Sequence, residues 1–123
     1  MGDIDAASEI RNIVSRCCQL VDDRRFDELV QCFAPDAELV FDGETFVGHD
    51  TLLARWQASP ARSGKHLTTN TVVEISGTTA TATSDFVYVW ADHTLGSMGR
   101  YTDQLVLLAG RWVLRRREVA LLA

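Results

Sequence analysis

With 123 residues, 46% of them hydrophobic and 24% charged, the chain is long enough to bury one core and too apolar for a disordered protein. Its formal charge of −5 argues against a nucleic-acid partner, which needs a basic surface to neutralise phosphates. The acidic start and the lack of a long apolar segment predict neither a signal peptide nor a membrane span. We therefore expect one cytoplasmic domain over residues 1–123, with no membrane partner.

Apolar side chains at helical spacing divide the first half of the chain into helices and a short hairpin. The helices are predicted over residues 5–23, 26–33 and 50–57. Pro35 and its neighbours end the second helix, because the residue before a proline disfavours helical backbone. A strand over residues 38–42 and a return strand over residues 45–47 flank the tight turn Asp42-Gly43.

The second half of the chain is predicted to be sheet. Long alternating segments indicate strands over residues 66–76, 79–91, 98–109 and 111–120, with residues 92–97 as a connection. Small side chains at Ala80, Ala82 and Ser84 on one strand face leave room for a cavity. The pattern predicts an α+β fold in which three N-terminal helices pack on a strongly curved, mostly antiparallel sheet that encloses a pocket.

The strand that begins at His66 holds the most informative residue of the chain. Alternation places His66 on one face with Thr68, Asn70 and Val72, and it places Leu67, Thr69 and Val73 on the other. A strand start can present a titratable group to a cavity, and histidine is the side chain that titrates nearest neutral pH. Considered alone, this strand favours a hydrogen-bonded structural histidine over a catalytic one.

Asp22 lies at the end of the first predicted helix, four residues after Cys18, so the two share a helix flank. If Cys18 is buried, Asp22 adjoins a buried surface. The three cysteines, Cys17, Cys18 and Cys32, fit neither a disulfide framework nor a zinc site and are expected to be small core residues. No His, Asp or Glu cluster has ligand spacing, so the sequence predicts no metal and no cofactor.

Motifs along nearly the whole chain resemble the SnoaL-like branch of the NTF2-like superfamily. In chain order they are Val21-Asp22, Phe26-Asp27-Glu28-Leu29, Phe33-Ala34-Pro35-Asp36-Ala37, His66-x-x-Thr69-Asn70, Gly77-Thr78-Thr79-Ala80-Thr81-Ala82, Gly99-Arg100-Tyr101-Thr102-Asp103 and Gly110-Arg111-Trp112. The resemblance implies a cone-shaped fold. It does not specify a reaction, because this scaffold hosts polyketide cyclases, dehydratases, a dehydrochlorinase, ketosteroid isomerase, epoxide hydrolases and non-catalytic subunits.

The local match is to the dehydratase and dehydrochlorinase group, which implies that His66 removes a proton and that Asp22 orients its ring. Tyr101 and Asp103 match a Tyr-x-Asp pattern whose residues face the same cavity. An arginine of the dehydrochlorinase is absent here, where Leu107 stands. The expected pocket wall consists of Cys18, Phe41, Trp56, Ser84, Phe86, Tyr88 and Leu105.

Three hypotheses remain open from the sequence. The first is a cofactor-independent lyase or isomerase that acts on a small hydrophobic, cyclic or polyketide-like substrate, with Asp103 or Tyr101 polarising a substrate oxygen. The second is an epoxide hydrolase or cyclase in which Asp103 is the acid or base. The third is a non-catalytic binding module. Asp103 would instead be structural if it paired with an arginine such as Arg100, and the run Arg115-Arg116-Arg117 is expected to be a solvated or ion-pairing edge.

The outward face of the predicted sheet is also apolar. Its members are expected to be Val73, Ile75, Val87, Val89, Val106 and Leu108. Because a sheet that is apolar on both sides needs cover on both sides, we expect a homodimer with twofold symmetry through this face.

Overall fold

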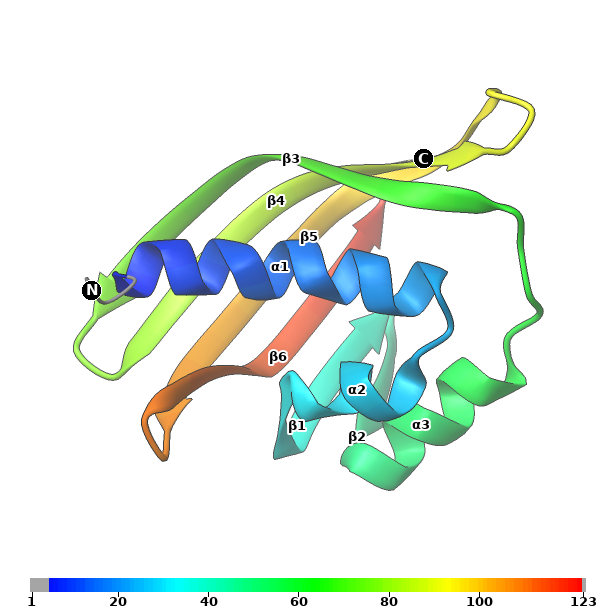
Figure 1. Cartoon of the computed structure of the whole chain (residues 1–123). Helices are drawn as coiled ribbons and strands as arrows, with labels where there is room; N and C mark the ends of the chain where they lie inside the picture. Colours follow the sequence, from blue (N-terminus) through cyan, green and yellow to red (C-terminus); the bar gives the residue numbers. More distant parts are fainter. Residues whose placement is uncertain (1–4, 123) are drawn as a thin grey trace.

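The computed structural model describes residues 5–122, so residues 1–4 and 123 of the expected domain lie outside the described part. The elements are α1 (Ala6–Asp22), α2 (Phe26–Gln31), β1 (Phe33–Phe41), β2 (Glu44–Val47), α3 (His49–Ala58), β3 (Gly64–Ser76), β4 (Thr79–Trp90), β5 (Leu95–Leu108) and β6 (Arg111–Leu121). The strands form one curled, six-stranded sheet in the order β2-β1-β6-β5-β4-β3, in which only the β1–β6 pair is parallel (Figure 1). The fold is α+β with a mixed sheet.

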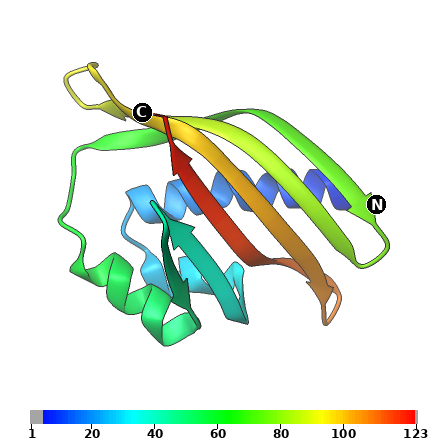
Figure 2. The same cartoon turned by 180° about the vertical axis from the view of Figure 1, so that it is seen from behind.

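Helix α1 crosses one face of the sheet, and the core forms between them (Figure 1). The helix begins at Asp5, whose carboxylate accepts a hydrogen bond from the Ser8 backbone N–H at 2.8 Å. Its buried residues Ile10, Val14 and Cys17 follow helical spacing. Each fully buried aliphatic side chain of this kind stabilises the fold by about 1.5–3 kcal/mol. The other face of β3–β6 is covered by none of the described helices (Figure 2).

A β-bulge in β3 corrects the predicted strand faces. Asn70 and Thr71 together stand opposite a single residue of β4, and Asn70 has a positive φ of 54°. The alternation therefore changes phase. Val73, expected outside, pairs with the fully buried Ala82 and packs against the core, while Val72, expected to share the His66 face, is 55% exposed. Ile75 likewise pairs with the buried Ala80, so it does not belong to the outward face.

Two element boundaries also differ from the prediction. Strand β1 starts at Phe33, where a helix end was expected, and Pro35 lies between the two points at which β1 pairs with β6. No ladder hydrogen bond is lost there, so proline is tolerated. Strand β5 starts at Leu95, inside the expected connection, because β4 and β5 form a long hairpin. Helix α3 follows the β1–β2 hairpin, and no helix within residues 5–122 is long and apolar enough to cross a membrane.

Candidate functional site

A hollow of about 230 Å³ lies on the helix-covered side of the sheet. Seven of the expected site residues border it, namely His66, Tyr101, Cys18, Phe41, Trp56, Phe86 and Tyr88. Asp22 and Asp103 do not border the hollow, but each contacts a residue that does. Asp22 contacts His66, and Asp103 contacts Arg117. Ser84 and Leu105, expected in the wall, are almost completely buried and are not among the bordering residues. Ala80 and Ala82 of β4 belong to the same hydrophobic core cluster as Ile10 and Val14 of α1, so the room expected above these small residues lies in the packed core.

The structure brings Asp22, the last residue of α1, against His66 near the start of β3. Asp22 Oδ1 lies 2.6 Å from His66 Nδ1, and Asp22 Oδ2 accepts a hydrogen bond from the His66 backbone N–H at 2.8 Å. The two side chains are only 7% and 15% exposed. A carboxylate at a helix C-terminus is disfavoured by the helix dipole, and the last turn of α1 has no basic residue. His66 therefore supplies the compensating contacts.

This contact determines what His66 can do chemically. A carboxylate accepts hydrogen bonds only, so His66 Nδ1 must hold the proton that the short contact requires. In the neutral imidazole the other ring nitrogen, Nε2, is the acceptor, and it has no hydrogen-bond partner among residues 5–122. Aromatic rings surround the imidazole, with the Tyr88 ring edge-on at 4.8 Å between centroids and Phe86 at 6.3 Å. A ring held in this way has the geometry that a general base needs.

Asp103 pairs with Arg117 and not with Arg100. Arg117 Nε and Nη2 donate to the two Asp103 oxygens at 2.8 and 3.0 Å, and the guanidinium carbon lies 4.2 Å from the Tyr101 ring centre. Burial alone would lower the pKa of Arg117, but Asp103 raises it above its ordinary value, so the guanidinium stays charged. Arg100 pairs with Asp85 on the outer face at 2.8 Å.

Arg117 is the functional residue that sequence reasoning missed. It was assigned to a solvated or ion-pairing edge, yet it is 6% exposed and borders the hollow. Its Nη1 has no hydrogen-bond partner within the described residues, so donors remain available to a bound molecule. The available sequence signal was alternation backwards from Val119, which places Arg117 on the inner face, next to Asp103 on the neighbouring strand.

Two further polar groups border the hollow in neutral form. Burial raises the pKa of Tyr101 above its ordinary value, so its hydroxyl is a hydrogen-bond donor at neutral pH. Burial also raises the pKa of Cys18, whose Sγ lies 4.0 Å from Thr68 Oγ1. Within residues 5–122, no group of three His, Cys, Asp or Glu side chains is arranged to hold a metal ion.

A family model described as the SnoaL-like domain matches residues 3–118. The chain belongs to the SnoaL-like family. No curated protein sequence matches it significantly. A Novosphingobium aromaticivorans NTF2-like protein with a cystatin-like fold is 27% identical over 93% of this chain and 80% of its own, with a TM-score of 0.79. A Mycobacterium tuberculosis protein of unknown function is 26% identical over 92% of this chain and 69% of its own, with a TM-score of 0.85.

A candidate scytalone dehydratase from Novosphingobium aromaticivorans has the same fold. It is 20% identical over 94% of this chain and 83% of its own, with a TM-score of 0.79. At this level of identity the likeness shows the fold alone. The SnoaL-like fold of the present chain is therefore shared with proteins named for different activities.

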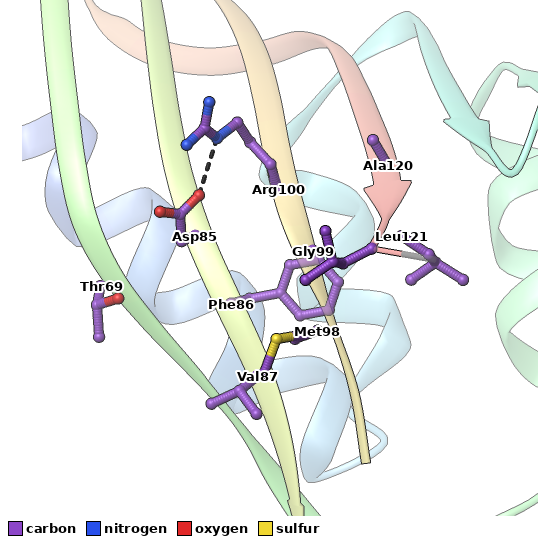
Figure 3. Close-up of a pocket in the computed structure, with 10 residues that line it drawn as sticks. Thr69, Asp85, Phe86, Val87, Met98, Gly99, Arg100, Ala120 and Leu121 are labelled. Atoms are coloured by element: carbon purple, nitrogen blue, oxygen red, sulfur yellow. Dashed lines mark hydrogen bonds and ion pairs between the residues drawn. The ribbon is translucent and has the colours of Figure 1, made fainter. Parts of the chain in front are cut away.

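The SnoaL-like domain has a second hollow, of about 570 Å³, on its outer sheet face. Figure 3 shows the Asp85–Arg100 ion pair at one end and the side chains of Val87, Met98 and Leu121 toward the other. The bordering surface is mostly apolar. His66, Tyr101 and Arg117 border the helix-covered hollow but not this one, so the two hollows differ in the polar side chains that they present.

Proposed function

We propose that the protein is a cofactor-independent lyase or isomerase that removes a proton from carbon in a small hydrophobic, cyclic substrate. The contact between His66 Nδ1 and Asp22 carries this proposal, because in the neutral imidazole it leaves Nε2 free to act as a base, and His66 borders a hollow with aromatic walls. The SnoaL-like family, whose fold is also that of a candidate scytalone dehydratase, is compatible with this class of reaction.

In a dehydration, His66 Nε2 takes the proton next to a substrate carbonyl, and the electron pair moves onto the carbonyl oxygen. Arg117 Nη1 and the neutral Tyr101 hydroxyl are the donors available to that oxygen. The enolate re-forms the carbonyl as the bond to the β-hydroxyl breaks, and the imidazolium returns its proton to the departing hydroxide to give water. Asp22 holds the ring and stabilises its transient positive charge.

The carboxylate-centred alternative, a hydrolase or cyclase that uses Asp103, has weaker support. Asp103 is completely buried, both of its oxygens accept hydrogen bonds from Arg117, and it does not border the hollow. A non-catalytic assembly module with a plugged cone is also less well supported, because side chains leave the hollow open. A non-catalytic protein that binds a small ligand remains the alternative that the test below separates from an enzyme.

The test uses a β-hydroxytetralone, which aromatises to a fluorescent naphthol once water is eliminated. We expect His66→Asn to lower turnover about 100-fold or more, since a positioned general base contributes roughly 10²–10⁴. Asp22→Asn keeps an acceptor for the His66 backbone N–H but no longer fixes the ring tautomer, so it should also lose rate. His93→Asn in the exposed β4–β5 turn is the matched control. An active His66→Asn protein would move the assignment to the carboxylate-centred reaction.

A further inference from the structure

The helix-covered hollow collects positive charge in an acidic protein. The chain has 17 acidic and 12 basic side chains apart from histidine, yet the residues that border the hollow include three arginines and no Asp or Glu. Arg117 is neutralised by Asp103. The other two, Arg55 and Arg62, have neither an ion-pair nor a hydrogen-bond partner among residues 5–122. Two guanidinium groups therefore face the hollow with their charge uncompensated.

Aromatic rings hold both groups in place. Arg55, half-buried on α3, has its guanidinium carbon 4.8 Å from the Phe41 ring centre and 4.5 Å from that of Phe46. Arg62, in the connection between α3 and β3, lies 4.8 Å from the Tyr88 ring centre. Contacts with ring faces restrain a guanidinium without using its N–H donors, which lie in its own plane. These donors remain available to a ligand.

Arg62 also lies close to the proposed base. Tyr88, the ring that Arg62 covers, is the ring whose centroid is 4.8 Å from that of His66. Arg62 and His66 therefore contact the same ring, and both border the hollow. An anionic group on the substrate would fix which end of the molecule points outward and which carbon meets His66 Nε2.

The size and walls of the hollow limit the rest of the molecule. A cavity of 150 Å³ accommodates benzene, so about 230 Å³ accommodates roughly ten non-hydrogen atoms. Phe41, Trp56 and Phe86 supply flat apolar walls suited to a ring. The planar guanidinium groups of Arg55 and Arg62 match a carboxylate, which can accept two parallel N–H···O bonds from an arginine.

We propose that the substrate bears a free carboxylate on a cyclic hydrocarbon body, and that Arg55 and Arg62 bind this carboxylate at the solvent side of the hollow. The term substrate rests on the proposed function, but the binding site itself does not. Because the whole chain is acidic, the two arginines would also offset the general repulsion that an anion meets on approach.

Isothermal titration calorimetry at low salt tests the site with phenylacetate and its neutral isostere phenylacetamide, for which millimolar affinity is ordinary at this size. We expect phenylacetate to bind about tenfold more tightly. Arg55→Gln and Arg62→Gln should each weaken phenylacetate binding by about fivefold and leave phenylacetamide binding unchanged. Arg115→Gln, an exposed arginine outside the hollow, makes the same charge change and should alter neither affinity.

Several results would overturn the proposal. The first is equal or tighter binding of phenylacetamide, and the second is no binding of either probe at about ten millimolar. The third is tighter binding of phenyl phosphate than of phenylacetate. The fourth is equal weakening of phenylacetate and phenylacetamide binding in the arginine variants. If Arg55→Gln does not fold, Arg55→Lys, which keeps the charge, should bind phenylacetate with intermediate affinity. The His66→Asn protein should still bind phenylacetate more tightly than phenylacetamide although it lacks the proposed base. The carboxylate site and the proposed reaction are thus tested separately, and either can fail without the other.

Discussion

The buried ion pair between Asp103 and Arg117 gives a double-mutant cycle with a large expected signal. Asp103→Leu leaves the guanidinium without its counter-ion, and Arg117→Met leaves a completely buried carboxylate without its donors. Removing one partner of a buried pair costs on the order of 3–5 kcal/mol. The lower end applies to Asp103→Leu, because Arg117 borders the hollow and its guanidinium can gain solvent contacts.

The double variant should recover most of this loss. Leucine and methionine restore apolar packing, and such replacements of a buried pair are often neutral or stabilising by about 1–4 kcal/mol. The coupling free energy between the two sites should therefore exceed about 3 kcal/mol. Urea unfolding followed by far-UV circular dichroism measures it, with the m-value as a check that the denatured states remain comparable.

Additive single effects in the double variant, or a single substitution costing less than about 1 kcal/mol, would refute this reasoning. The stable double variant has a further use. It lacks the guanidinium that we propose as a donor to the substrate oxygen, so it should be folded but slow in the β-hydroxytetralone assay. Such a separation would indicate that Arg117 is retained for chemistry and not for stability.

Three further predictions test other parts of the structure. The neighbouring Cys17 thiol lowers the pKa of Cys32 to about 7, so iodoacetamide labelling of Cys32 should rise through pH 7 as the thiolate forms. A midpoint at the ordinary value near 9 would contradict this prediction. Gly99→Ala should destabilise the fold by about 2 kcal/mol or more in urea, because an added Cβ would overlap the Ala120 carbonyl oxygen; an unchanged midpoint would show that β5 and β6 separate easily. We propose that a second copy covers the outer hollow, so sedimentation should report about twice 13.7 kDa and Met98→Asp should give a monomer, while a monomeric parent protein would refute the interface.

Local patterns predict most of the helices and strands, and they place Asp22 at a helix end and His66 near a strand start. The apolar spacing in α1 determines which side of the helix is buried, and Asp22 lies at the C-terminal end of that side. His66 begins a strand before any irregularity occurs, so its inward face is predicted correctly by alternation. These two residues are 44 positions apart, but each is positioned by its own element, and the resemblance to SnoaL-like proteins links them.

Residues beyond a bulge could not be placed in the same way. Alternation has period two, so one extra residue reverses every later assignment in a strand. Nothing in the residues Asn70 and Thr71 indicates which of them is unpaired, although asparagine tolerates the positive φ observed there. For this reason Val73 was assigned to the outer face.

A second β-bulge, in β6, explains why Arg117 borders the hollow. On β6, Trp112 and Leu114 face inward, and Arg115 is an extra residue relative to β5, where Leu105 pairs with Leu114 and Gln104 with Arg116. Without it, strict alternation would direct Arg116 and Glu118 inward. With it, Arg117 lies beside Asp103 and its charge is compensated inside the fold. The bulge thus turns Arg116 and Glu118 outward and places one arginine with a buried partner and unused donors on the inner face. Arg117 therefore borders the same hollow as His66, as the proposed chemistry requires.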